Sequence, residues 1–217
     1  MAAEFWHVLN RGVEKRDIVM DDRDRARFIH DLYVMNDANI VQHIYQPQRQ
    51  GLLPYSRRQL VRIHAFCLMN NHYHLLLSPI SEGGISAFMQ KFNMGYSKYF
   101  NERYKRTGVL WQGKHKKIRI ERDAHFMYVP YYIHLNPLDY GMRSWREGRA
   151  LDVTAALKKL RAYRWSSHLD YLGAKNFPSV VDKSELSELF GKSARYERGL
   201  TDIITSRTLA SRSTAIE

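Results

Sequence analysis

Cysteine is nearly absent from this chain of 217 residues, since Cys67 is its only one. An internal disulfide and a cysteine-based zinc site are therefore excluded. The first residues, MAAEFWH, lack a basic start followed by an apolar run, and so do not look like a signal peptide. No apolar stretch is long enough to span a bilayer, and no Walker-type phosphate loop occurs. We therefore expect a cytoplasmic protein that has no membrane partner and works without ATP.

Acidic side chains are also in short supply. The chain has 22 Asp and Glu against 34 Lys and Arg, which gives a net charge of +12. Such an excess favours polyanionic partners, with nucleic acid the first choice and acidic membrane the second. The alternative is a surface that is basic only for solubility. With 44% hydrophobic residues, the chain has enough apolar side chains to form a core.

Secondary structure can be placed from hydrophobic periodicity and turn residues. The segments expected to be strands are residues 4–10, 61–69, 72–78 and 114–120. The helices are expected to begin at Asp21 or Asp22, at Gly83 and at Asp123. This β-α-β-β-α-β order, followed by a helix, predicts an α+β fold of the ferredoxin-like kind, an antiparallel sheet with helices on one face.

Two connections bear on this layout. Asn70-Asn71 separates the second and third strands, and asparagine tolerates the left-handed conformation of a tight hairpin turn. We therefore expect residues 61–69 and 72–78 to pair antiparallel. The polar stretch 37–58 reads as a connection or an insertion, and its role stays open.

We expect two regions, a core of residues 1–140 and a C-terminal helical extension of residues 141–217 packed on it. The extension is rich in basic and aromatic side chains, which suits either a surface that grips nucleic acid or a structural cap. These side chains are Arg143, Arg146, Arg149, Lys158, Lys159, Arg161, Arg164, Trp145 and Trp165.

A candidate metal site begins with His72 and His74. Because side chains alternate along a strand, both imidazoles point to the same face, the one that we expect helices to leave open. Two imidazoles on one face are half of a metal site, although a His-x-His pair also arises by chance.

Tyr132 and Asn136 are four residues apart and share one face of the predicted third helix. The Asn136 carbonyl oxygen can complete a His-His-Asn set around Mg²⁺ or Mn²⁺. Tyr132 would then lie beside the cation as a candidate nucleophile. Two structural alternatives stay open, namely that Tyr132 is a core residue and that Asn136-Pro137 only ends the helix.

The segment around the fourth strand has the composition of a surface that follows a nucleic-acid backbone. Its candidate DNA-binding residues are Lys114, Lys116, Lys117, Arg119 and the stacking residue Trp111. The alternative is a solvated strand edge protected by lysines.

Several segments together resemble the REP-associated tyrosine transposases, a branch of the single-tyrosine HUH, or IS200-like, transposases. They are the opening HVLNRG, CLMNNHYHLLL from Cys67, YFNERYKRTGVLWQGKHK, YYIHLNPLDYG, and YRWSS with a downstream YLG. The resemblance runs from about residue 4 to residue 173, with the motifs in order and at matching spacing. The sequence departs from many relatives at Asn70-Asn71, where they have Pro-Asn, and in the longer polar stretch 37–58.

The resemblance implies a metal-dependent endonuclease and strand transferase that acts on single-stranded DNA near hairpins. A tyrosine attacks the phosphorus, which gives a 5′-phosphotyrosine and a free 3′-hydroxyl. The implied HUH histidines are His72 and His74, the third ligand is Asn136, and the nucleophile is Tyr132, with its neighbour Tyr131 as the alternative. The implied contacts near a guide tetranucleotide beside a REP-like palindrome include Asn10, Arg11 and Gly12.

Relatives are monomers or homodimers, and the resemblance implies a bacterial cytoplasmic, nucleoid-associated protein. Two other functions remain: an HUH replication or mobilisation initiator with the same chemistry, and a non-catalytic regulator that binds hairpin nucleic acid. A cleavage assay on a hairpin oligonucleotide with Mn²⁺ separates the regulator from the enzymes.

Overall fold

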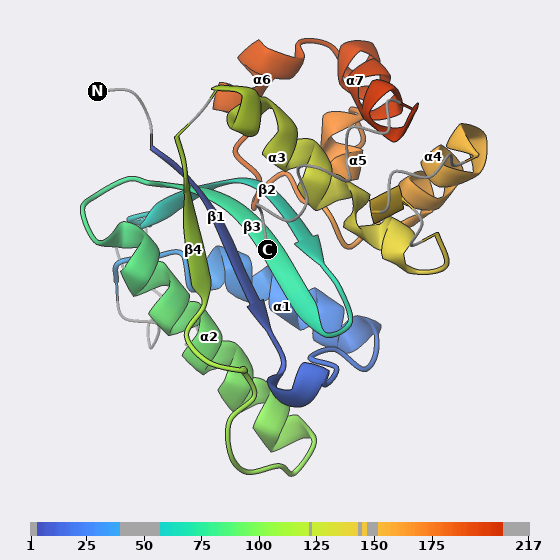
Figure 1. Cartoon of the computed structure of the whole chain (residues 1–217). Helices are drawn as coiled ribbons and strands as arrows, with labels where there is room; N and C mark the ends of the chain where they lie inside the picture. Colours follow the sequence, from blue (N-terminus) through green and yellow to red (C-terminus); the bar gives the residue numbers. More distant parts are fainter. Residues whose placement is uncertain (1–3, 40–56, 122, 143–144, 147–151, 206–217) are drawn as a thin grey trace, which may run out of the picture.

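A four-stranded antiparallel sheet organises the protein (Figure 1). The computed structural model describes residues 4–39, 57–121, 123–142, 145–146 and 152–205. The strands are β1 (Phe5–Arg11), β2 (Val61–Leu68), β3 (His72–Pro79) and β4 (Lys116–Ile120). They lie in the order β2-β3-β1-β4, and all three neighbouring pairs are antiparallel. This is the strand order of a ferredoxin-like split sheet, so the predicted α+β fold is confirmed.

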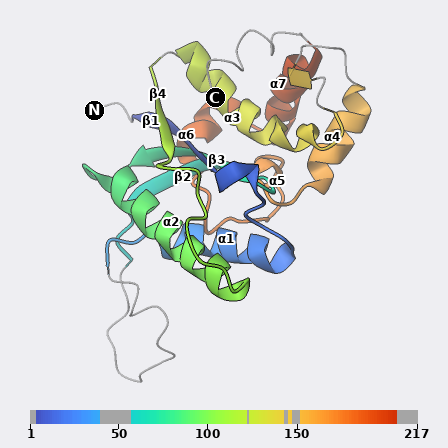
Figure 2. The ribbon, with the colours of Figure 1, turned by 60° about the horizontal axis from the view of Figure 1, so that its bottom comes forward.

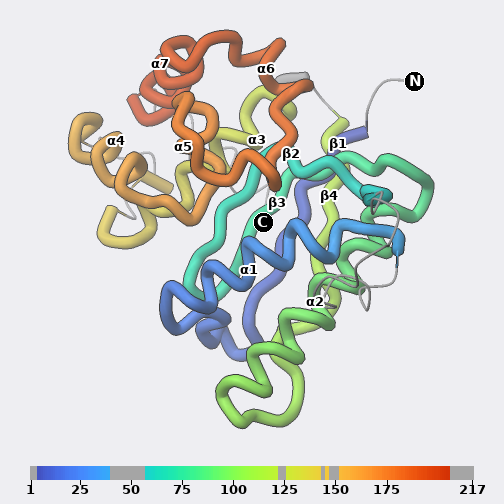
Figure 3. The backbone as a smooth tube through the Cα atoms, turned by 180° about the vertical axis from the view of Figure 1, so that it is seen from behind, coloured from blue at the N-terminus to red at the C-terminus, as the bar shows by residue number. Residues whose placement is uncertain are grey.

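Two helices cover one face of the sheet. These are α1 (Asp22–Val34) and α2 (Gly84–Arg103), and Figure 2 shows them together below the sheet. Seen from behind, both cross in front of the strands (Figure 3). The predicted start of α1 is confirmed, because the Asp21 side chain caps it by accepting a hydrogen bond from the Asp24 backbone N–H at 3.1 Å.

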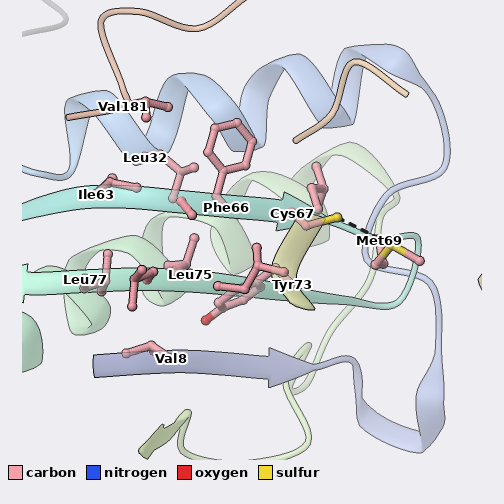
Figure 4. Close-up of a cluster of buried hydrophobic side chains, with 14 of the residues drawn as sticks. Val8, Leu32, Ile63, Phe66, Cys67, Met69, Tyr73, Leu75, Leu77 and Val181 are labelled. Atoms are coloured by element: carbon pink, nitrogen blue, oxygen red, sulfur yellow. Dashed lines mark hydrogen bonds between the residues drawn. The ribbon is translucent and has the colours of Figure 1, made fainter. Parts of the chain in front are cut away.

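The main hydrophobic core lies between this face and the two helices. Val8, Leu75 and Leu77 come from adjacent strands and are fully buried (Figure 4). Tyr73 is buried beside them, and its ring contacts Phe28 of α1 with a centroid distance of 5.3 Å. Its hydroxyl donates to an α2 side chain, so this buried phenol has a hydrogen-bond partner and serves the core.

The predicted hairpin between β2 and β3 is confirmed, but its turn works differently from the expectation. The backbone N–H of Met69 donates to the His72 carbonyl at 2.8 Å, which closes the two-residue turn. Neither Asn70 nor Asn71 is left-handed, since the described non-glycine residues with positive φ are Glu14, Lys15 and Lys105. The turn is instead held by hydrogen bonds to residues 15–25. Its contacts are Ile18 N and Val19 N to Asn70 O, Arg25 to Asn70 Oδ1, and Asn71 Nδ2 to Lys15 O.

The second face of the sheet is not open, which corrects the expectation for the histidine side. The helix α3 (Asp123–Leu135) packs across it, on the side opposite α1 and α2 (Figures 1 and 2). Its residues Val129, Tyr132 and Ile133 have no exposed surface. Such an apolar helix has to be covered, and the sheet supplies one side of that cover.

The C-terminal region contains α4 (Val153–Ala162), α5 (His168–Tyr171), α6 (Ser184–Phe190) and α7 (Ser193–Thr205). Its backbone bonds directly to the edge strand β2. Leu68 N donates to Trp165 O at 3.0 Å, and Ser167 N donates to Phe66 O at the same distance. Residues 165–167 therefore lie along β2 as a short additional pairing, and the extension is joined to the core through its main chain.

A buried polar network also joins α3 to the extension. His134 of α3 bonds through Nε2 to the Ser167 hydroxyl at 2.7 Å and through Nδ1 to the Tyr196 hydroxyl at 2.8 Å. The Tyr196 hydroxyl also contacts His168 Nδ1 at 2.8 Å. One phenol can donate to one ring and accept from the other. Burial lowers the pKa of His134 well below its ordinary value, so the imidazole is neutral and α3 is fixed without a buried charge.

The polar stretch 37–58 lies mostly outside the described residues. Its ends meet, because Ala38 N donates to the Arg58 carbonyl at 2.7 Å. The start and end of this stretch are therefore adjacent, as in an insertion. Among the helices of the described residues, none combines the length and the apolar composition needed to cross a bilayer.

Candidate functional site

The histidine pair lies on the face of β3 that α3 covers. His74 is paired across the sheet with Leu9 of β1, and His72 with Arg11. The two imidazole rings are perpendicular, with centroids 5.1 Å apart. Strand alternation thus places both rings on one face, as predicted from the sequence.

Both rings are oriented through Nδ1. His72 Nδ1 lies 2.6 Å from the side-chain oxygen of Asn71, which can only accept, so this nitrogen carries the proton. His74 Nδ1 lies 2.9 Å from Nε2 of His7 on β1. The Nε2 atom of His74 is buried and has no hydrogen-bond partner in the described part of the chain. Fixing one ring nitrogen while the other faces the site is the usual arrangement of a metal-binding histidine.

The surroundings keep the His74 imidazole neutral. Burial lowers its pKa well below the ordinary value, and the neighbouring His7 and His72 rings lower it further. The neutral imidazole is the form that binds a cation. His7 had no assigned role in the sequence analysis, because only the pairing of β1 with β3 brings it to His74.

Tyr132 reaches the same cluster from α3. Its ring meets the His74 ring edge-on with centroids 5.7 Å apart, and the His7 ring at 6.1 Å. Tyr132 is also fully buried, so it is a core residue as well as a candidate site residue. Tyr131 points elsewhere, since its ring stacks on Tyr196 of α7 with centroids 5.4 Å apart.

Asn136 begins the short 3-10 helix η3 (Asn136–Asp139) and is fully buried. Its amide nitrogen donates to the Tyr132 carbonyl at 2.8 Å, which turns its oxygen away from the helix. The structure therefore brings His72, His74, Tyr132 and Asn136 into one neighbourhood. Three of them, His74, Tyr132 and Asn136, are buried.

Arg146, from the extension, completes this neighbourhood and was not predicted as a site residue. It donates through Nη1 to the Tyr132 hydroxyl at 3.0 Å and through Nη2 to Asn136 Oδ1 at 2.9 Å. Its Nε contacts Asp139 Oδ1 at 2.8 Å. Burial acts to lower its pKa, but the hydrogen bonds to Asp139 raise it above the usual value overall, so the guanidinium is charged. The only sequence signal for it was the basic composition of the extension.

A pocket of about 310 Å³ opens beside the histidines. Several predicted residues line it, including His72, His74, Asn10, Arg11, Lys114 and Lys116. The pocket therefore connects the candidate metal ligands with part of the candidate DNA-binding set.

The remaining members of that set lie elsewhere. Strand alternation sends Lys117 to the opposite face of β4, where its ammonium lies 4.2 Å from the centre of the Trp6 ring. Arg119 is on that face too and pairs with Glu4 at 2.7 Å. Both line a separate hollow of about 1270 Å³. The basic segment is thus divided between two surfaces. The alternation of side chains along a strand could have predicted this division from the sequence.

Three predicted contact residues have structural roles. The Trp111 ring meets Tyr73 edge-on, with centroids 5.5 Å apart, and its Nε1 donates to the Asn93 carbonyl, so it is anchored in the core. Asn10 is buried and donates to the Gly113 carbonyl at 3.2 Å. A Cβ at Gly12 would lie 2.3 Å from the Arg16 carbonyl oxygen, so a close backbone approach requires glycine here.

The tryptophans of the extension also pack inward. Trp145 is buried, and its Nε1 donates to Asp139 at 2.7 Å. Trp165 is half-buried and stacks on Phe177. Arg143 and Arg149, named with them in the sequence analysis, lie outside the described residues.

The two histidines suit a hard cation only if the Asn136 side-chain oxygen is a third ligand. Within the described ranges, no group of three or more His, Cys, Asp or Glu side chains is placed to hold a metal. The fitting donors are His74 Nε2, which is buried and unpartnered, together with His72 and the oxygen of Asn136. Two imidazoles and one carbonyl oxygen are compatible with Mg²⁺ or Mn²⁺, with substrate oxygens or water completing the shell.

Comparison with known proteins agrees with these motifs. The family model described as "Transposase IS200 like" matches residues 37–136, which span the histidine pair, Tyr132 and Asn136. This match, which covers less than half of the chain, agrees with the resemblance drawn from the sequence motifs.

One solved structure is similar in fold and is described as the structure of the REP associates tyrosine transposase bound to a REP hairpin. The similarity covers 84% of this chain and 89% of the other, with 13% identity and a TM-score of 0.48. Likeness at this level assigns no residue roles. No curated protein matches the chain.

Proposed function

We propose that this protein is a metal-dependent endonuclease and strand transferase that acts on single-stranded DNA beside hairpins. The observation that carries the proposal is the meeting of the Tyr132 hydroxyl, the His72-His74 pair and Asn136 from separate elements, next to a pocket lined by basic residues. The match of residues 37–136 to the IS200-like transposases supports it. The proposed substrate is a REP-like hairpin with flanking single strand, in the bacterial cytoplasm at the nucleoid. The protein would act as a monomer or a homodimer.

The proposed mechanism uses Tyr132 as the nucleophile. His72 Nε2, His74 Nε2 and Asn136 Oδ1 would hold Mg²⁺ or Mn²⁺, which supplies polarisation of the scissile phosphate. His7 and Asn71 fix the two imidazoles in the required tautomer through their Nδ1 contacts. Tyr132 forms a 5′-phosphotyrosine and releases a 3′-hydroxyl, and reversal of that step on another strand rejoins DNA without ATP.

The metal requirement is tested by replacing the imidazoles. We expect His72→Ala combined with His74→Ala to lower the rate of Mn²⁺-dependent hairpin cleavage by about 10²-fold or more, because the cation loses two of its three protein ligands. Mn²⁺ binding measured by electron paramagnetic resonance should weaken in parallel. His30→Ala is the matched control, since His30 lies on α1 with a half-exposed side chain. Equal cleavage and Mn²⁺ binding in all three proteins would contradict the assignment.

The division of the basic segment gives a second test. Lys114→Gln with Lys116→Gln should weaken hairpin binding and lower the salt dependence of log K by about 0.7 per lost contact, since both residues line the histidine pocket. The comparison pair, Lys117→Gln with Arg119→Gln, removes the same charge from the opposite face and should have a smaller effect. Binding titrations at several salt concentrations measure both slopes. Equal slopes would mean that DNA contacts both faces or neither.

A second function has one observation in its favour. His74, Tyr132 and Asn136 are buried, and the Asn136 oxygen is engaged by Arg146, which would suit a regulator that binds hairpins without cutting them. Hairpin binding without any covalent adduct in Mn²⁺ would establish that function. An HUH replication or mobilisation initiator would share the adduct and differ in its DNA target.

A further inference from the structure

We propose that Arg146 is a catalytic residue whose guanidinium stabilises the phenolate oxygen of Tyr132, both when it attacks phosphorus and when it leaves. This inference rests on the proposed function, because it assigns a second participant to the same transesterification. It places part of the catalytic machinery in the C-terminal region, after the segment that matches the family model.

The contact that carries the inference involves the reacting atom itself. Arg146 Nη1 lies 3.0 Å from the Tyr132 hydroxyl oxygen, and the centre of the guanidinium lies 5.5 Å from the centre of the tyrosine ring. The guanidinium therefore contacts Tyr132 at its hydroxyl oxygen and also lies over its ring. A hydrogen bond from a cation is worth more to a phenolate than to a phenol, so this contact favours the charged form.

The Asp139 carboxylate holds the Arg146 guanidinium in place. Asp139 accepts from Arg146 Nε at 2.8 Å and from Nη2 at 2.9 Å, and Trp145 donates to the same carboxylate at 2.7 Å. The Arg146 side chain keeps 22% exposure and Asp139 keeps 16%. A cation fixed in advance by two hydrogen bonds requires little rearrangement when charge develops on the nucleophile.

The planar fork of arginine suits this position. One guanidinium contacts the Tyr132 oxygen through Nη1, the Asn136 oxygen through Nη2 and the Asp139 carboxylate through Nε and Nη2. A lysine ammonium carries the same charge but cannot reach three groups in one plane. Because Arg146 contacts Asn136 Oδ1, a cation held by Asn136 would share this amide oxygen with the guanidinium.

The chemical step is balanced without an added reactant. The Tyr132 oxygen forms a bond to phosphorus as the bond from phosphorus to the 3′-oxygen breaks. The phenol loses one proton to solvent, and the departing 3′-oxygen takes one from solvent. In the rejoining step the phenolate is the leaving group, and the same guanidinium stabilises it.

Arg146→Gln tests the role in catalysis. We expect the rate of adduct formation on a hairpin oligonucleotide with Mn²⁺ to fall by about 10²- to 10³-fold, the usual effect of removing one preorganised donor. Arg146→Lys should recover only part of that loss. Arg198→Gln is the matched control, because it removes the same charge from an exposed position of α7. Mn²⁺ binding should not weaken in Arg146→Gln, since Asn136 loses a competing partner.

A second measurement distinguishes a role at the reacting oxygen from a structural role. A fluorinated tyrosine at position 132 forms a phenolate that is more stable by itself, and we expect it to recover part of the adduct-formation rate that Arg146→Gln loses. An unchanged rate in Arg146→Gln, or a lost rate that the fluorinated tyrosine does not recover, would overturn the role of Arg146 alone. No adduct in the unaltered chain would overturn the proposed function, and the catalytic role with it.

Discussion

Tyr132→Phe is expected to abolish covalent attachment to DNA, with a loss of about 10³-fold or more, because it removes the proposed nucleophile. The phenylalanine ring can keep the edge-on contact with His74, so folding should be preserved. Removing the hydroxyl leaves Arg146 paired with Asp139 and Asn136, so no buried charge loses all of its partners. Denaturing gel electrophoresis of a labelled hairpin oligonucleotide measures the adduct, and a gel shift measures binding, which should be nearly unchanged.

Tyr131→Phe is the matched comparison at the adjacent position. Its ring stacks on Tyr196 and contacts Phe190, so it faces the C-terminal helices and not the histidine pair. Burial raises the pKa of Tyr131 to about 12, which makes its hydroxyl a poor nucleophile at neutral pH. Tyr131→Phe should still form the adduct. An inactive Tyr131→Phe beside an active Tyr132→Phe would move the nucleophile by one residue, and activity in both would exclude a tyrosine mechanism.

A chain that ends at Ala162 is expected not to fold stably. The deletion removes the backbone bonds to β2 from residues 165–167 and the Ser167 and Tyr196 hydroxyls that satisfy His134. It also removes the amphipathic helices α6 and α7, whose buried side chains include Leu186, Phe190 and Leu200. Exposure of a buried large apolar side chain costs about 1.5–3 kcal/mol. A few such losses equal the whole stability of a typical domain, about 5–15 kcal/mol.

The matched control is a chain that ends at Thr205, which keeps α4 to α7 and should melt like the full chain. Circular dichroism melting curves and hydrogen exchange compare the three lengths. Tyr196→Phe provides a milder version, since it removes one hydroxyl from two buried imidazoles and should cost about 1–3 kcal/mol. A stable chain ending at Ala162 that loses only hairpin discrimination would show that the extension serves recognition and is not a cap.

Local features of the fold were predictable from the sequence. The Asp21 cap, the hairpin of β2 and β3, and the shared face of His72 and His74 depend on residues close together in the chain. These features follow from helix capping and from the alternation of side chains along a strand, and neither rule requires knowledge of tertiary structure. The placement of Tyr132 and Asn136 one helical turn apart follows in the same way.

Features that depend on distant contacts were not predictable. His7 meets His74 because of the register between β1 and β3, and 67 residues separate them. Arg146 contacts Tyr132 from 14 residues further along the chain. Composition marked Arg146 as basic, but nothing in its sequence surroundings distinguishes it from the other arginines of the extension. Trp111 likewise looked like a stacking residue until its contact with Tyr73 placed it in the core.

The bonds between residues 165–167 and β2 also restrict how copies of this chain can associate. A sheet can grow from one molecule into the next only where an edge strand offers unpaired backbone groups. On the β2 side, Trp165 and Ser167 already occupy such groups of Leu68 and Phe66. The other edge of the sheet is β4, where Lys116 and Lys117 of two molecules would approach with like charge. Growth of a continuous sheet from molecule to molecule is therefore disfavoured at both edges.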